Sequence, residues 1–419
     1  MSPANPPTPL SLLPLPSQEA LRSAYVGQPL SALRTPAIIV DRKRFIDNSE
    51  RVTREAERRG MKFRAHVKTH KTINGVRLQA KASKGVTAFI ASTLPEVYYL
   101  AHSGMVEEGL ISDILYSLPI SSDKLDELSD IQRHCADKAV IRVMVDHPDQ
   151  IRLLDAYAGN TARGGKPWSC FIKVNGGGNR SGVPAESEQM KTLIKAAMAA
   201  ENVEIFGFYS HFGQSYASKT LSTATDFYHA EVNCVNTAAK VARQLGAKGD
   251  WMLSVGATPT AHAATTIDEQ SLTLEGELEL HAGCYCLNDL QQLATGLIPP
   301  TACALTVLAR VVSTYPERGD RGEAMSDCGA LAVSKDTGPV PGYGRVMWPE
   351  HLAGWDLGRV SQEHGTLVKR DGDADVAVGD LVRILPQHAC LVCAAHPWLY
   401  VVEDGGETVV DVWVTWKGW

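Results

Sequence analysis

Short apolar runs alternate with helical patterns from about Ala37 to Cys286, and this alternation limits the possible folds more than any other feature. Runs that are apolar throughout are typical of parallel strands covered by helices. We expect strands at residues 37–40, 63–68, 86–91, 110–116, 139–145, 171–174, 203–209, 252–255 and 278–280. Helical patterns cover residues 45–56, 94–101, 122–135, 187–200 and 223–245. About eight strands in about 250 residues favour a (β/α)₈ barrel over an open doubly wound sheet.

After Pro299 the pattern changes to short strands separated by turns, with no long helix. Strands are expected there at residues 305–312, 329–334, 381–385, 398–402 and 408–415. The first 18 residues are rich in proline and lack the basic and continuous apolar parts of a signal peptide. We therefore predict an α/β chain whose three parts are a proline-rich extension joining the β domain (1–34), a (β/α)₈ barrel (35–298) and a C-terminal β domain (299–419).

Composition excludes several classes of protein. Hydrophobic residues are 44% and charged residues 21%, which is ordinary for a globular chain. Lys and Arg number 41 against 47 Asp and Glu, so the net charge of −6 predicts no nucleic-acid partner and no anionic membrane partner. No apolar run reaches about 18 residues, so no membrane span is expected. The nine cysteines lack the spacing of a disulfide framework, which predicts a reducing, cytoplasmic compartment.

A cluster of basic residues, from Arg64 to Lys71, ends the second predicted strand. Strand periodicity puts Arg64, His66 and Lys68 on one face, toward the barrel interior. Buried cations need an anionic partner or a lysine of lowered pKa. A desolvated lysine suits Schiff-base chemistry, because only the neutral amine attacks a carbonyl. The alternative is a basic strand end at the surface.

Two further segments place polar side chains at strand ends. The glycine-rich segment 173–183 lacks the last glycine of a dinucleotide-binding fingerprint. It is either a surface turn or a tight loop that delivers Arg180 to a site at the strand end. The segment 206–216 brings Tyr209, His211 and Tyr216 near the end of another strand.

Glycines and small polar residues end the last two barrel strands. Gly256 and Thr258 begin a possible helix, where free backbone N–H groups suit a phosphate, although an ordinary helix cap explains the pattern equally. Gly283 and Cys284 end the last strand, where barrels often complete a phosphate site.

The β domain contains a candidate metal site, because His388 and Cys390 would project from one strand face about 7 Å apart. Two such ligands can hold zinc and leave positions open for substrate. Two alternatives remain. One is a closed structural site that adds Cys393 and His396, and the other is a buried cluster without metal.

These motifs occur in one order, and together they resemble the zinc-dependent D-serine dehydratases of eukaryotic type. That family belongs to the alanine-racemase-like enzymes that use pyridoxal 5′-phosphate (PLP), with the D-threonine aldolases as relatives. The resemblance covers about residues 35–419. It implies a PLP-binding (β/α)₈ barrel, a β domain that carries the zinc site, and a homodimer.

The resemblance also implies roles for individual residues. Lys68 would be the catalytic Schiff-base lysine, and His388 and Cys390 would be the ligands of Zn²⁺. The residues that would contact PLP besides Lys68 are Arg180, Tyr209, Tyr216, Gly256, Thr258, Gly283 and Cys284. Asn175 and Cys284 depart from the aspartate and asparagine that are common in relatives at those positions.

The implied reaction is the β-elimination of D-serine, a small D-amino acid, to pyruvate and ammonia. The alternative is a D-threonine or other D-3-hydroxy amino acid aldolase, which gives glycine and an aldehyde. Cys390 favours the dehydratase, because the aldolase branch has an aspartate there. A racemase would need a second base and no zinc, and a non-enzymatic cofactor carrier would lack the C-terminal domain.

Overall fold

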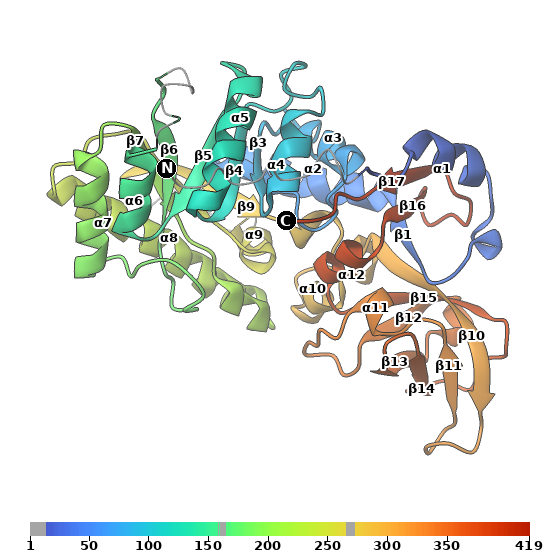
Figure 1. Ribbon diagram of the computed structural model, residues 1–419. Helices are drawn as coiled ribbons and strands as arrows, with labels where there is room; N and C mark the ends of the chain where they lie inside the picture. The colour runs from blue at the N-terminus through green and yellow to red at the C-terminus, as the bar shows by residue number, and fades with distance from the viewer. Residues whose placement is uncertain (1–13, 158, 160–164, 265–272) are drawn as a thin grey trace.

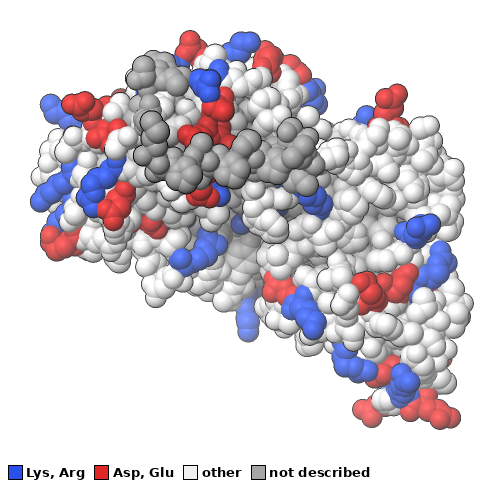
Figure 2. Space-filling model, viewed as in Figure 1, with Lys and Arg blue, Asp and Glu red and all other residues white. Residues whose placement is uncertain are grey.

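The protein consists of a barrel and a β-sheet domain that lie side by side (Figure 1). The computed structural model describes residues 14–157, 159, 165–264 and 273–419. Most of the proline-rich extension, residues 1–13, therefore lies outside the described residues. Within the described part of the chain, no helix is both long and apolar enough to cross a membrane. Basic and acidic side chains are interspersed on the face that Figure 2 shows.

The predicted (β/α)₈ barrel with a C-terminal β domain is confirmed. Eight parallel strands form a closed barrel, and pairing of the last strand with the first completes it. The barrel strands are β2 (Lys62–His66), β3 (Ala88–Ala91), β4 (Asp113–Pro119), β5 (Val140–Val145), β6 (Trp168–Lys173), β7 (Val203–Tyr209), β8 (Trp251–Val255) and β9 (Gly276–Ala282).

Helices surround the barrel, and most begin at a polar capping residue. Side chains of Asp41, Thr72, Thr93, Ser187 and Thr220 accept backbone N–H groups of the first turn, which stabilises each helix start. The helices are α2 (Arg42–Arg58), α3 (Ile73–Ala80), α4 (Leu94–Ala101), α5 (Leu125–Cys135), α6 (Pro148–Asp155), α7 (Glu188–Ala199), α8 (Leu221–Gln244) and α9 (Thr258–Ala264).

The strand expected at residues 37–40 does not belong to the barrel. Strand β1 (Ala37–Asp41) pairs antiparallel with β10 (Leu305–Tyr315) and parallel with β16 (Trp398–Val402) in the C-terminal sheet. All of its residues are buried, and a run buried on both faces has the same local pattern in either sheet. Helix α2, which follows β1, packs between α3 and α9 and so closes the ring of helices.

The β domain is a nine-stranded sheet of order β11-β14-β13-β12-β15-β10-β1-β16-β17. The expected strand at 329–334 is instead the single helical turn α11 (Ala330–Val333), because the backbone of Ser334 turns back to donate to the Ala330 carbonyl oxygen at 2.7 Å. The remaining strands are β11 (Glu323–Ser326), β12 (Gly344–Trp348), β13 (Trp355–Val360), β14 (Gly365–Lys369), β15 (Leu381–Pro386) and β17 (Asp411–Val414).

The segment before β1 packs on this sheet. Helix α1 (Gln18–Tyr25) lies against β17, and Arg22 donates to Asp411 at 2.6 Å. Leu30 and Leu33 are buried in one cluster with Tyr400 of β16. The sheet therefore draws strands and packing residues from both ends of the chain.

The barrel interior contains a network of buried charged side chains. Arg64 Nε donates to Glu279 Oε1 at 2.8 Å, and its Nη2 donates to Asp113 Oδ2 at 3.0 Å. Arg142 Nε also donates to Asp113, at 2.7 Å. The inward position of Arg64 and its need for an anionic partner are thus confirmed. Burial alone would lower the pKa of Arg64, but both carboxylates outweigh it and keep the guanidinium charged.

We expect Arg64→Met to lower the free energy of unfolding by about 3–5 kcal/mol, because it leaves Glu279 buried without its cation and Asp113 with Arg142 alone. The matched control is Arg54→Met, which breaks an exposed pair with Glu50 on α2 and should cost less than about 1 kcal/mol. Urea unfolding followed by circular dichroism measures both. Equal losses in the two variants would contradict the interpretation.

Candidate active site

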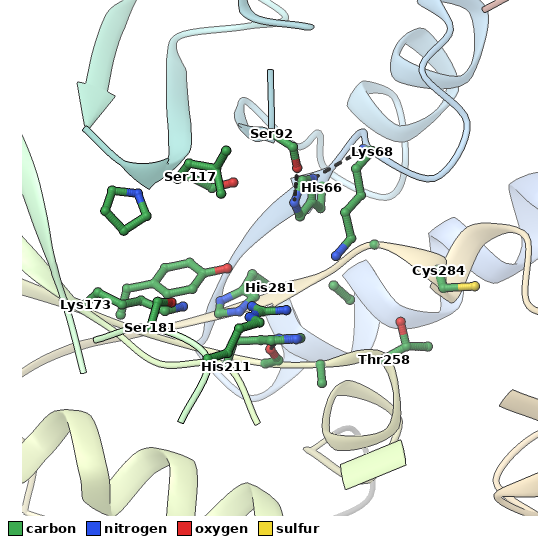
Figure 3. A pocket seen from close by; sticks show the side chains of 18 of the residues that line it. His66, Lys68, Ser92, Ser117, Lys173, Ser181, His211, Thr258, His281 and Cys284 are labelled. Carbon is green, nitrogen blue, oxygen red and sulfur yellow. Dashed lines mark hydrogen bonds between the residues drawn. The ribbon is translucent and has the colours of Figure 1, made fainter. Parts of the chain in front are cut away.

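A cavity of about 550 Å³ opens at the carboxyl ends of the barrel strands (Figure 3). In (β/α)₈ barrels this end carries the active site. Every barrel residue predicted for the site lines this cavity, although the structure does not test the role of any of them. They are Lys68, Arg180, Tyr209, Tyr216, Gly256, Thr258, Gly283 and Cys284.

Lys68 lies just beyond the end of β2, and its side chain extends into the middle of the cavity (Figure 3). His66 fixes the start of this loop, since its Nδ1 accepts the Lys68 backbone N–H at 3.3 Å. Ser92 lies 3.3 Å from the other ring nitrogen. Gly283 lies beside this side chain, since a Cβ there would be in van der Waals contact with Lys68 Cε, at 3.5 Å.

The glycine-rich loop after β6 is held by its own side chains. Asn175 Oδ1 accepts the backbone N–H of Gly177 at 2.9 Å, and Asn175 also donates to Asn179 at 2.9 Å. Gly182 has φ +95°, and a Cβ there would come within 2.8 Å of the Val174 backbone. This turn brings Arg180 to the cavity, as the loop interpretation predicts.

Lys173 is a second lysine in the cavity, and the sequence analysis did not select it. It is buried at the end of β6, with Nζ 4.0 Å from the centre of the Tyr209 ring. Burial, reinforced by the charge of Arg180, lowers the pKa of Lys173 to about 7. Its position at the inward end of an apolar strand is the signal that would have identified it.

Two imidazoles complete the floor of the cavity. His281 stacks on Tyr209 with ring centres 4.1 Å apart, and His211 Nδ1 lies 2.7 Å from the Gly256 carbonyl oxygen. Desolvation, reinforced by neighbouring cations, holds the pKa of both histidines well below its ordinary value. Both rings are therefore neutral near pH 7.

The composition of this cavity fits an anionic cofactor such as PLP. Among the described residues, Asp146 is the single acidic side chain in a lining that includes Lys68, Lys173 and Arg180. His281 Nε2 is buried without a hydrogen-bond partner in the described part of the chain. Gly256 is required where the strand ends approach, because a Cβ there would lie 1.9 Å from the His281 carbonyl oxygen.

A second cavity of about 390 Å³ adjoins the first and is lined by both domains. Lys68, Arg180, His211 and Tyr216 line both cavities. His388, from the β domain, lines the second one. The candidate metal residue thus faces the same space as the barrel lysine.

The strand geometry expected for His388 and Cys390 is wrong. Strand β15 ends at Pro386, His388 is the N-cap of helix α12 (Ala389–Ala395), and Cys390 lies in its first turn. The run of alanine and leucine in α12 has high helix propensity, so the chain turns into a helix after the strand. The cap geometry nevertheless brings the two side chains into contact.

The surroundings of His388 and Cys390 favour a positively charged imidazole and a negatively charged thiolate. His388 Nδ1 lies 2.6 Å from Asp336 Oδ2. Burial opposes the charged imidazole, but contact with Cys390 and the nearby carboxylates raises the pKa of His388 to about 10. The Cys284 thiol, together with His388, holds the pKa of Cys390 well below its ordinary value.

The closed four-ligand site is contradicted. His396 Nε2 lies 3.0 Å from the Ala332 carbonyl oxygen, and no three His, Cys, Asp or Glu side chains in the described ranges are grouped to hold a metal. The imidazole and thiolate of His388 and Cys390 are donors that suit zinc. A metal held by these two alone would keep coordination positions open.

Comparisons with known proteins agree with this architecture. Residues 40–273 match the family model "Alanine racemase, N-terminal domain", and residues 304–402 match "Putative serine dehydratase domain". The chain is 38% identical to the D-serine dehydratase of Schizosaccharomyces pombe, over 96% of each chain. It is 33% identical to that of Saccharomyces cerevisiae, over 95% of this chain and 99% of the relative.

A solved structure shares the whole fold. The D-threo-3-hydroxyaspartate dehydratase of Delftia sp. HT23 superposes with a TM-score of 0.81 at 28% identity, covering 94% of this chain and all of the relative. A cysteine-to-alanine mutant of an enzyme with this name has also been solved and is described as metal-free. With full-length identity above 30% and the same two-domain fold, the chain belongs to the D-serine dehydratase family of alanine-racemase-like proteins.

Proposed function

We propose that the protein is a PLP-dependent lyase that converts D-serine to pyruvate and ammonia, with zinc as a second cofactor. One observation carries the proposal: Lys68 of the barrel and His388 of the β domain line the same cavity. The names of the two yeast relatives support D-serine as the substrate. An aldolase reaction on D-threonine is the alternative that the experiment below decides.

When bound, PLP supplies an electron sink that makes the α-proton of the amino acid acidic. In this chain Lys68 would hold the cofactor, and the residues Gly256 and Thr258, just after β8, would hold its phosphate. Once released from the cofactor, Lys68 Nζ would be the base that takes the α-proton. Arg180 adds positive charge, and Lys173, whose pKa is lowered to about 7, adds it in part, which favours the substrate carboxylate in the cavity.

His388 and Cys390 would hold zinc, which supplies a Lewis acid for the departing β-hydroxyl. The contact of Nδ1 with Asp336 would orient the imidazole, so that Nε2 would be the nitrogen that binds the metal. The cysteine-to-alanine mutant of the solved dehydratase is described as metal-free, which supports a metal in that enzyme.

We further propose a homodimer in a reducing, cytosolic compartment. All nine cysteines are free thiols, which supports that compartment. Leu331 of α11 and Leu391 of α12 are 56% and 46% exposed, on two helices that pack together at the edge of the site. Covering this apolar face with a second copy would also exclude water from the cavity.

Removal of zinc by a chelator should stop pyruvate formation from D-serine, and added zinc should restore it. The absorbance of bound PLP and the circular dichroism spectrum should stay unchanged, because the metal activates a leaving group and does not hold the fold. D-β-Chloroalanine should retain more turnover in the metal-free enzyme, since chloride leaves without Lewis-acid help. Product analysis by chromatography measures each reaction.

Two results would contradict this proposal. One is full-rate elimination of D-serine by the metal-free enzyme. The other is glycine and acetaldehyde from D-threonine without pyruvate from D-serine, which would assign the protein to the aldolase reaction.

Lys68→Ala should reduce turnover by about 10²–10⁴-fold or more, because it removes both the cofactor attachment and the base. Borohydride reduction followed by peptide mapping should place the pyridoxyl label on Lys68. Lys173→Ala is the matched control, and its label should remain on Lys68. A label on Lys173 in the wild-type protein would refute the assignment.

Sedimentation velocity should find two copies in the active particle. Leu391→Asp should weaken the association, because it places a charge on the apolar face of α12. Leu221→Asp, on an equally exposed leucine of α8, should leave the mass unchanged. A fully active wild-type monomer would exclude the dimer.

A further inference from the structure

Asp289 is a fully buried carboxylate at the junction of the two domains. Its Oδ1 accepts the Gln292 backbone N–H at 2.9 Å and so caps helix α10 (Leu290–Ala294). Its Oδ2 accepts the Ala389 backbone N–H at 2.9 Å and the Cys284 thiol at 3.1 Å. A buried carboxylate with this many donors is stably held.

These contacts converge on the candidate metal residues. Ala389 lies between His388 and Cys390, so its bond to Asp289 fixes the backbone of both. Cys284, whose thiol donates to Asp289, lies near enough to Cys390 for the two thiols to interact. Thr69, the residue after Lys68, lies 3.2 Å from Cys390 Sγ through its hydroxyl. The barrel therefore interacts with Cys390 through two of its side chains and holds the backbone before it through a third.

Neighbouring residues of α10 support the same loop. Gln291 Nε2 donates to Asp336 Oδ2 at 3.2 Å, and the Gln291 backbone N–H donates to the Gln387 carbonyl oxygen at 3.2 Å. Asp336 is the partner of His388. The short segment from Asp289 to Gln291 thus supports both candidate ligands. Asp289 binds the backbone between them, and Gln291 binds Asp336, the partner of His388.

We propose that Asp289 and Cys284 are positioning residues for the metal, because they hold the His388–Cys390 segment of the β domain at a fixed place over the barrel mouth. This inference rests on the proposed function. Asp289 lines neither cavity that contains Lys68, so its effect should fall on metal binding and not on PLP, whereas Cys284 lines the larger cavity as well. Partners that orient a metal ligand typically change metal affinity by about 10–100-fold.

The test measures zinc binding on the PLP-loaded, full-length enzyme after removal of its metal. Competition with a chromophoric chelator gives the zinc dissociation constant for the wild type, Cys284→Ala and Asp289→Asn. Cys286→Ala is the matched control, because Cys286 is equally buried in the same turn but donates to the Gly283 carbonyl oxygen. Cobalt(II) in place of zinc gives a thiolate charge-transfer band that reports the Cys390 bond.

Cys284→Ala and Asp289→Asn should raise the zinc dissociation constant by about 10–100-fold and shift or weaken the cobalt band. PLP absorbance should stay at the wild-type level in Asp289→Asn, and Cys286→Ala should match the wild type in every reading. If Asp289→Asn fails to fold, the zinc dissociation constant and cobalt spectrum of Cys284→Ala test the proposal instead, because this substitution removes a single small group.

The outcomes separate this inference from the proposed function. A wild-type protein that binds no zinc would overturn the metal part of the proposed function. Wild-type zinc binding with unchanged affinity and cobalt spectrum in Cys284→Ala would overturn only the positioning roles. An equal loss in Cys286→Ala would do the same, because it would show a general effect of changing the turn.

Discussion

Positive charge buried along the barrel axis is the constraint on which the site depends. At the lower end, Arg64 and Arg142 are neutralised by Asp113 and Glu279, so that end is a closed structural network. At the other end, where the carboxyl ends of the strands lie, the positive charges are not matched by carboxylates. Lys68, Lys173 and Arg180 share a cavity whose described lining contains one carboxylate, Asp146. The charges at the first end are paired within the protein. The excess of positive charge at the second end favours binding of an anionic ligand.

Because of the position of the β domain, residues of both domains line the cavity next to Lys68. Strand β1 lies in the sheet, and helix α2, which follows it, lies in the ring around the barrel. One continuous segment therefore links the two domains. Figure 1 shows α10 and α12 at their junction, where Asp289 binds the first turn of α12. The position of the candidate metal residues His388 and Cys390 thus depends on a sheet built from distant parts of the chain.

The chemistry of His388 and Cys390 bears on which metal they could bind. An imidazole and a thiolate make a softer site than an imidazole and a carboxylate, and they favour zinc. The neutral imidazoles of His211 and His281 add polar groups to the cavity without more charge. The side chain of Lys68 extends into this cavity (Figure 3).

Local pattern was sufficient wherever the cause was local. Strand β7, helix α4 and strand β16 begin and end where periodicity predicted, and the strand-end motifs fall on one cavity because parallel strands of a closed barrel end at one rim. The sequence pattern could not predict which sheet β1 joins, because a strand buried on both faces has the same pattern in either sheet.

Tertiary structure decided the rest. His388 and Cys390 meet through a helix cap and not through a strand, because the short helix-forming run after Pro386 outweighs strand alternation. Asp289 carried no sequence signal, since its partner Ala389 is 100 residues away. The sequence by itself determined the barrel, the second domain and the residue types of the site. Only the packed structure determined which charges are neutralised and which are left for a ligand, because that depends on contacts between residues far apart in the chain.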